Sequence, residues 1–160
     1  MGTGWAPYEK QNSGASEVKF VEKLRVLLVD DEREFLETLI KRLRKRNLEV
    51  GAANSGEEAL QVLRETPVDV VVLDVRMPGM DGIQVLREMK RINPLIQVIM
   101  LTGHASVEVA VEGMELGAFD YLMKPANLDE LLYKIQDAYK AKTIQEQKIA
   151  RLKEMGGTAA

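Results

Sequence analysis

The stretch VDVVVLDVRMPGMDG, residues 68–82, decides the fold of this chain. Its first six residues, Val68 to Leu73, are apolar apart from one acid and lack the alternation of a half-exposed strand. Such a run is typical of a strand that helices bury on both faces. Asp74 follows the run directly, and Met77 to Gly82 has the proline and glycines of a turn. The stretch therefore predicts a buried strand that ends in an acid and a tight loop.

Four further runs have a strand-like composition, and segments of helical period separate them. The runs are Arg25–Val29, Leu48–Ala53, Ile96–Leu101 and Phe119–Met123. The second run is short and the last contains Asp120, so both are expected at the edges of the sheet. Five alternating units of strand and helix predict an α/β fold with a parallel sheet and right-handed crossovers.

Capping patterns predict where the helices begin and end. Ser55 and Glu58 have the spacing of a capping box for a helix that runs to about Glu65. The other expected boundaries are an end near Asn47, a helix over Gly82–Ile92, a cap at Ser106 with an end at Gly117, and a start at Asn127 with Glu130.

Polar residues follow four of the strand-like runs, at the point where each run ends. They are Asp30 with Asp31, then Asp74, Thr102 and Lys124. The carboxyl ends of parallel strands open onto one crevice, so these residues can converge there. The strand order 2-1-3-4-5 gathers them most tightly, and it predicts a flavodoxin-like doubly wound sheet.

Composition is consistent with one domain that carries tails. We expect residues 23–139 to form the domain, 1–22 to be a flexible extension or an added leader, and 140–160 to be an extended helix or linker and tail. A net charge of -3 and a pI near 5.4 argue against nonspecific nucleic-acid binding. The 160 residues contain no cysteine, membrane-length apolar run or signal peptide, so a cytoplasmic location is the simplest interpretation.

A basic cluster is the one feature of the sequence that favours nucleic-acid binding. It consists of Arg42, Arg44, Lys45 and Arg46. These residues fall at the end of a predicted helix, where cations favour the macrodipole, so a solvated helix face explains them better.

The residues expected in the crevice have a definite chemistry. Three close carboxylates need a counter-charge, and hard oxygen ligands select Mg²⁺ or Mn²⁺ over zinc. Asp74 is the best candidate for a covalent phosphoryl acceptor, with Lys124 and Thr102 binding the phosphoryl oxygens. The simpler alternative is that an acid such as Asp31 only caps a helix.

Four segments together resemble the receiver domain of two-component response regulators. They are Val29–Glu32, Asp74–Gly82, Thr102–Gly103 and Lys124–Pro125, within a match of about Leu24 to Tyr139. The segment from Thr102 to Tyr121 is most similar to receivers of the nitrogen-regulation class, which usually precede an ATPase and a DNA-binding module. The resemblance implies a partner output domain or separate effector, and a role in signalling rather than as an ordinary enzyme.

The resemblance also implies a role for each site residue. Asp74 would accept the phosphoryl group from the phosphohistidine of a sensor histidine kinase or phosphotransfer protein. Mg²⁺ would lie on Asp31, Asp74 and the backbone carbonyl of Arg76, with Asp30 in support. Thr102 would move toward the phosphoryl group and Tyr121 would rotate behind it, which changes a partner-binding face. The Lys124–Pro125 peptide is expected to be cis.

Two residues occupy positions that vary among receivers. Arg76 and His104 each lie two residues beyond a motif residue, Asp74 and Thr102. By resemblance they would lie near the water that hydrolyses the acyl phosphate, so they are candidates for tuning its lifetime. Two exposed loop side chains are an equally simple interpretation.

Three other functions are alternatives to a receiver. A haloacid-dehalogenase-like phosphatase needs a second Asp two residues after its nucleophile, where this chain has Arg76. A flavodoxin needs a phosphate loop rich in hydroxyls and glycine after the first strand, where this chain has acids. A phosphorylation-independent homodimer is favoured by the apolar tail residues Ile144, Ile149, Leu152 and Met155.

Overall fold

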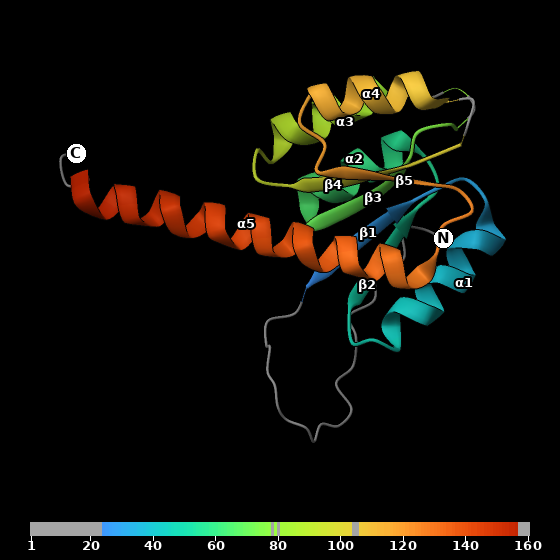
Figure 1. Cartoon of the computed structure of the whole chain (residues 1–160), viewed down its shortest axis with the longest axis horizontal. Helices are drawn as coiled ribbons and strands as arrows, with labels where there is room; N and C mark the ends of the chain where they lie inside the picture. The colour runs from blue at the N-terminus through green and yellow to red at the C-terminus, as the bar shows by residue number, and fades with distance from the viewer. Residues whose placement is uncertain (1–23, 78, 80, 104–105, 157–160) are drawn as a thin grey trace.

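A computed structural model describes residues 24–77, 79, 81–103 and 106–156 of the chain. The elements alternate between strand and helix through the domain, as the apolar runs predicted (Figure 1). The expected extension at residues 1–22 lies outside the described residues, as does His104. No helix among the described residues is both long and apolar enough to cross a membrane.

Five parallel strands form one sheet, and their bounds lie close to the predicted runs. They are β1 Arg25–Val29, β2 Glu49–Ala53, β3 Val70–Asp74, β4 Gln97–Thr102 and β5 Asp120–Met123. Their order in the sheet is β2-β1-β3-β4-β5, which confirms the predicted 2-1-3-4-5 topology. The two weakest runs, β2 and β5, are the edge strands, as expected.

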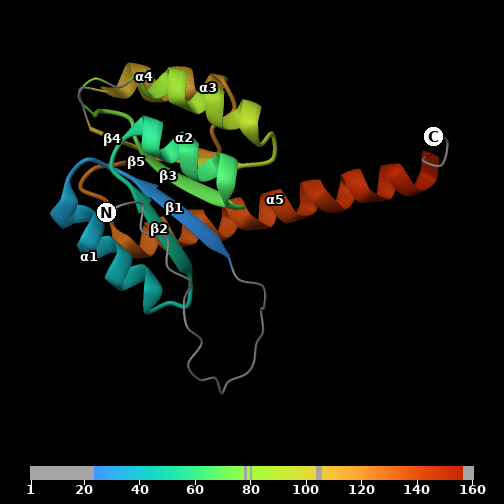
Figure 2. The ribbon, with the colours of Figure 1, turned by 180° about the vertical axis from the view of Figure 1, so that it is seen from behind.

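Helices cover both faces of the sheet. They are α1 Arg33–Arg44, α2 Gly56–Glu65, α3 Gly82–Ile92, α4 Val107–Glu115 and α5 Leu128–Gly156. Helices α1 and α5 lie on one face, and α2, α3 and α4 lie on the other (Figures 1 and 2).

The central strands are buried on both sides, which explains their unbroken apolar composition. In β3, Val71 and Leu73 belong to the core under α2 to α4, whereas Val70 and Val72 belong to the core under α1 and α5. Each face therefore requires an apolar residue at every second position of the strand. Because both faces are buried, the strand is apolar throughout and shows no alternation of apolar and polar residues.

Most predicted caps form, with two differences. Ser55 Oγ accepts from the Glu58 amide at 3.0 Å, but the Glu58 carboxylate accepts from Asn54 instead of from Ser55. At α4, Ser106 occupies the N-cap position without a side-chain capping bond, so that part of the prediction is wrong. Its backbone φ of -115° and ψ of 17° depart from the extended conformation that usually aims a capping hydroxyl at the first turn.

The basic cluster at the end of α1 is only partly a solvated face. Arg42, Lys45 and Arg46 are exposed, as expected. Arg44 is half-buried, and its guanidinium donates to the Val50 carbonyl of β2 at 2.8 Å. This arginine therefore ties α1 to the edge strand, which a helical pattern alone does not reveal.

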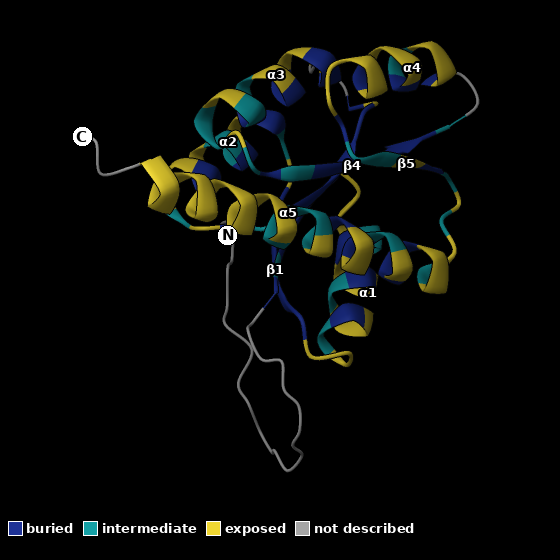
Figure 3. Cartoon of the chain, turned by 60° about the vertical axis from the view of Figure 1, so that its left-hand side comes forward, coloured by how far each residue is buried: buried dark blue, intermediate teal, exposed yellow. Residues whose placement is uncertain are grey.

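The last helix is much longer than the others. The 29 residues of α5 begin with the predicted cap, in which Asn127 Oδ1 accepts from the Glu130 amide at 2.9 Å. Its first half packs on the sheet, whereas its second half projects from the domain with nearly all side chains exposed (Figure 3). This agrees with the predicted extended C-terminal helix.

Candidate functional site

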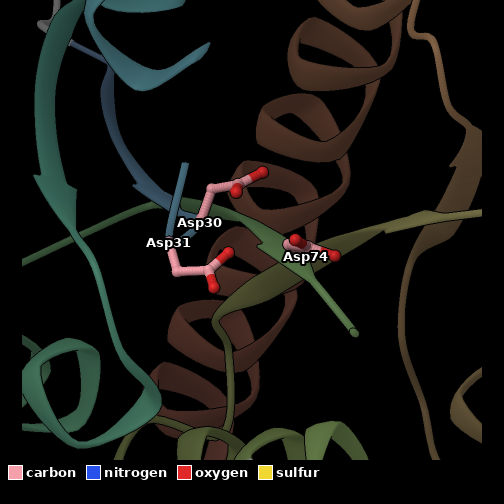
Figure 4. A group of neighbouring side chains, drawn as sticks. All are labelled: Asp30, Asp31 and Asp74. Atoms are coloured by element: carbon pink, nitrogen blue, oxygen red, sulfur yellow. The ribbon is translucent and has the colours of Figure 1, made fainter. Parts of the chain in front are cut away.

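Three carboxylates meet at the carboxyl ends of β1 and β3. Asp30 and Asp31 follow β1 directly, and Asp74 is the last residue of β3. One oxygen of each carboxylate lies within 4.8 Å of the others (Figure 4). Because β1 and β3 are paired neighbours, the sheet order itself brings these acids together. Asp30 and Asp74 are buried, whereas Asp31 is exposed.

Lys124 bridges the two buried acids from the loop that follows β5. Its ammonium lies 3.1 Å from Asp30 Oδ2 and 3.4 Å from Asp74 Oδ2. The Lys124 amide donates to the Thr102 carbonyl at 2.8 Å, and the peptide between Lys124 and Pro125 is cis. The lysine therefore supplies the counter-charge that the paired acids need.

Backbone amides hold the two buried carboxylates in place. Asp30 Oδ1 accepts from the Glu32 amide at 2.9 Å, and Asp74 Oδ1 accepts from the Arg76 amide at 3.0 Å. Each acid thus bonds the amide two residues later, which fixes its side chain at the start of a loop. The opposite oxygen of each carboxylate is left for Lys124.

The acid and the amine of the site both have raised pKa values, for different reasons. Burial raises the pKa of Asp74, and the nearby charge of Asp30 adds to this rise, against the lowering effects of the Arg76 amide and Lys124. Burial alone would lower the pKa of Lys124, but hydrogen bonds and charges from Asp30 and Asp74 outweigh it and raise that pKa. The site therefore holds excess negative charge around Asp74.

Thr102 and Tyr121 lie on the strands beside β3. Thr102 is fully buried at the end of β4, and its hydroxyl donates to the Gly103 carbonyl at 3.2 Å. Tyr121 lies on β5 next to Met100 of β4, and its side chain is 44% exposed. The Thr102 hydroxyl thus lies at the carboxyl ends of the strands, as the three acids do. The Tyr121 side chain faces solvent.

Arg76 contributes its backbone to the site and leaves its side chain outside. Its amide donates to Asp74, while the residue as a whole is exposed.

Asp31 is not a helix cap, because α1 begins at Arg33 and Glu32 holds the N-cap position. The simpler interpretation of Asp31 therefore loses its support.

Two contacts of the Lys124 ammonium were not predicted from sequence. The ring of Phe35 lies under the Lys124 ammonium, 5.0 Å from ring centroid to Nζ, which is cation–π geometry. Glu32 Oε1 lies 3.8 Å from the same ammonium. Phe35 is one of several apolar residues of α1, and nothing in the sequence of that helix distinguishes a core residue from one beneath a cation.

The donor set fits a divalent cation of the magnesium type. Clustered carboxylate oxygens at the end of a sheet, without thiolate or imidazole nearby among the described residues, are hard ligands that prefer Mg²⁺ or Mn²⁺. The exposed Asp31 carboxylate makes the cluster reachable from solvent. Fold and site together thus define a doubly wound α/β domain with a lysine-bridged cluster of carboxylates that suits a divalent cation.

Comparison with known proteins identifies the family. The response regulator receiver domain family matches residues 26–136. The transcriptional regulatory protein ZraR of Escherichia coli K12 is 43% identical over 117 residues, 73% of this chain and 26% of ZraR. The regulatory protein AtoC of the same organism is 40% identical over 123 residues, 77% of this chain and 27% of AtoC.

A solved structure supports the same assignment. A response regulator receiver domain protein from Clostridium thermocellum is 36% identical, with a TM-score of 0.73 over 76% of this chain and 98% of that one. The chain therefore belongs to the response regulator receiver domain family, and it resembles the nitrogen-regulation class, to which ZraR and AtoC belong. It spans about a quarter of the length of these two curated relatives.

Proposed function

We propose that this receiver accepts a phosphoryl group on Asp74 from the phosphohistidine of a sensor histidine kinase or phosphotransfer protein. A carboxylate oxygen of Asp74 attacks phosphorus, a P–O bond forms, and the P–N bond to the donor imidazole breaks. The imidazole nitrogen leaves with the bonding electron pair and takes a proton from solvent. The observation that carries this proposal is the Asp30, Asp31 and Asp74 cluster bridged by Lys124.

The surrounding residues have supporting roles in the proposed transfer. Lys124 already contacts Asp74 at 3.4 Å, so it can pair with a phosphoryl oxygen there. The Arg76 amide holds the other Asp74 oxygen and so orients the nucleophile. Asp31, Asp74 and the Arg76 carbonyl would hold Mg²⁺, with Asp30 in support. The bound cation would neutralise charge on the phosphoryl oxygens.

Phosphorylation would then change a partner-binding face. Thr102 donates only to the neighbouring Gly103 carbonyl among its described bonds, and it can exchange this bond for one to a phosphoryl oxygen. We propose that Tyr121, now exposed, turns inward as Thr102 moves, which alters the surface of α4, β5 and α5. A charge change at one site would thus bias a packing element with two arrangements.

The proposed domain organisation is a receiver over residues 23–139 with a helical tail at 140–160. Its partners would be the kinase and either an output domain or a separate effector, in a cytoplasmic setting and without direct nucleic-acid contact. Its only catalysis would be its own phosphorylation and dephosphorylation. The exposed side chain of Arg76, with His104, would tune the second of these reactions. Unchanged dephosphorylation in both Arg76→Ala and His104→Ala would contradict this tuning role.

The proposal is tested with Mg²⁺ and acetyl phosphate as a small phosphodonor. Intact mass spectrometry should show an adduct of one phosphoryl group on the wild type and none on Asp74→Asn. Asp129→Asn, which removes an exposed acid of α5, is the matched control and should keep the adduct. Chelation of divalent cations should abolish the reaction. An equal adduct on Asp74→Asn would refute the assignment of Asp74.

The tail supports a second proposal, a homodimer. Four apolar side chains on the projecting half of α5 are 36–72% exposed: Ile144, Ile149, Leu152 and Met155. Exposed apolar residues on one helix are typical of a short helical dimer seam. Sedimentation velocity at several concentrations tests this, with Leu152→Lys expected to weaken the dimer. If Asp74→Asn dimerises as the wild type does in the presence of Mg²⁺ and acetyl phosphate, dimerisation is independent of phosphorylation.

A further inference from the structure

A second charged cluster lies at the opposite end of the sheet from Asp74. Asp69, the residue before β3, places Oδ1 3.0 Å from the ammonium of Lys142 in α5. The same ammonium lies 2.6 Å from Glu146 Oε2, one turn further along α5. This cluster has no part in the proposed phosphoryl transfer, so its position in the fold needs its own explanation.

Asp69 is held firmly by the sheet. Its amide donates to the Arg25 carbonyl at 3.0 Å, and its carbonyl accepts from the Gln97 amide at 3.3 Å. Its second carboxylate oxygen, Oδ2, accepts from the Arg25 amide at 2.9 Å. The carboxylate that meets Lys142 is therefore fixed relative to β1 and β4, and it cannot follow the helix if the helix moves.

Lys142 lies where α5 leaves the domain. Ala138, one turn earlier, is the last fully buried residue of the helix, and residues from Ile144 onward are exposed. The Lys142 side chain is only 13% exposed. Burial alone would lower its pKa, but hydrogen bonds with Glu146 and Asp69 outweigh it and raise that pKa, so the amine is charged at neutral pH.

We infer that the Asp69–Lys142 ion pair sets the direction in which the distal half of α5 leaves the receiver. Apolar packing through Ile135 and Ala138 holds the helix against the sheet. Apolar contacts are not directional, so they only weakly resist sliding and tilting of the helix where the packed segment ends. A charged contact to a fixed carboxylate, one turn past the last apolar contact, adds a directional constraint at the exit.

The pair also connects the exit of α5 to the strand that carries the proposed phosphoacceptor. Asp69 immediately precedes β3, and Asp74 ends it, with every residue between them buried. At about 3.3 Å per residue, the two acids lie about 16 Å apart along one strand. The tail is thus anchored to the same rigid element as the site, and this inference goes beyond the proposed function without depending on it.

Distance measurements between spin labels test the inference. The chain has no cysteine, so Glu37→Cys on α1 and Glu154→Cys on distal α5, both exposed, give a clean labelled pair. Residues 143–156 span about 20 Å, and a tilt of about 20° would move their end by about 7 Å. Lys142→Met and Asp69→Asn should each shift or broaden the distance distribution on this scale. An excess of unlabelled chain prevents distances between labels on two different copies from contributing to the distribution.

The variants are chosen to isolate the ion pair. Asparagine at 69 can still accept from the Arg25 amide, and methionine at 142 keeps most of the aliphatic stem. Lys148→Met removes an exposed lysine further along α5 and should leave the distances unchanged. The double variant should change the distribution no more than Lys142→Met alone, because Lys142→Met already removes the contact with Asp69.

Three outcomes would overturn the inference. The first is an unchanged distribution in both single variants. The second is an equal change in Lys148→Met. The third is loss of amide-exchange protection beyond residue 142 in the single variants. The ion pair would then stabilise the helix itself and not set its direction. Phosphoryl uptake measured on the same variants is expected to stay at the wild-type level, so a failure here is separate from a failure at Asp74.

Discussion

The Lys124 ammonium lies 3.1 Å from Asp30 Oδ2, although 94 residues separate the two in the chain. This contact joins the end of β1 to the loop after β5, across the full width of the acidic site. Because Lys124 also reaches Asp74, one cation compensates two buried carboxylates. The receiver site is therefore pre-arranged around its lysine.

Removing this cation should destabilise the domain. Lys124→Met leaves Asp30 and Asp74 buried without their counter-charge, and the expected cost is about 1–3 kcal/mol of unfolding free energy. Urea denaturation at neutral pH measures it. Lys134→Met is the matched control, because its partner Asp120 is partly exposed and the loss should stay below about 1 kcal/mol. Added Mg²⁺ should recover part of the stability of Lys124→Met, and equal losses in both variants would contradict the prediction.

Asp31 should matter for the cation and little for stability. It is exposed, so Asp31→Asn should change the unfolding free energy by less than about 0.5 kcal/mol. Loss of one of few carboxylate ligands should weaken Mg²⁺ affinity by about tenfold or more. Isothermal titration calorimetry measures this, with the exposed Glu34→Gln in α1 as control. Wild-type affinity in Asp31→Asn would exclude Asp31 as a ligand.

The two helix caps of α3 and α4 should respond differently to alanine. Asp81 Oδ1 accepts from the Ile83 amide at 3.0 Å and the Gln84 amide at 3.3 Å, so Asp81→Ala should cost about 1 kcal/mol. Ser106 makes no capping bond, so Ser106→Ala should cost clearly less. Thermal and urea denaturation of both variants compare them, and a larger loss for Ser106→Ala would show that the serine does cap α4.

Gly113 should be needed for the close packing of α4 on β4. A Cβ at this position would overlap the Met100 thioether, so Gly113→Ala requires Met100 to shift at a cost of about 1–3 kcal/mol. Met100 is flexible, which favours the lower end of that range. Gly156→Ala, with nothing near the added carbon, is the control and should have almost no effect. Equal stability of both variants by urea denaturation would mean that Met100 adapts without cost.

The Lys142 ion pair should make part of the stability pH-dependent in the alkaline range. The folded pKa of Lys142 is raised, so its contribution is complete below the unfolded value of 10.5 and is lost as pH rises through the folded value. Lys142→Met should therefore lose less stability than the wild type between neutral and strongly alkaline pH. Urea midpoints across this range measure the difference, and parallel curves would contradict the linkage.

Much of the fold was accessible from sequence because its signals are local. The buried strands β1, β3 and β4 needed apolar residues on both faces, and this requirement shows directly as unbroken apolar runs. The caps at Ser55 and Asn127 each depend on an amide three positions later, so short patterns can contain them. Ser106 failed as a prediction because residue type alone does not determine backbone dihedral angles.

The contacts that the sequence did not reveal are side-chain contacts between packed elements that no motif links. The contact of Phe35 with Lys124 and the bond of Arg44 to Val50 each join α1 to another part of the fold, and no motif connects either pair. The pairing of Asp69 with Lys142 joins residues that no motif connects. Such contacts depend on the packing of α1 and α5 on the sheet, which short-range patterns do not encode.

By itself, the order of residues determined which segments become strand or helix and which polar groups end the strands, because these outcomes follow from burial and hydrogen bonding over a few positions. Only the tertiary structure decided that Lys124 bridges Asp30 and Asp74, and that Lys142 meets Asp69 where α5 leaves the domain. These distances depend on how the helices pack against the sheet, and packing is a property of the whole folded chain.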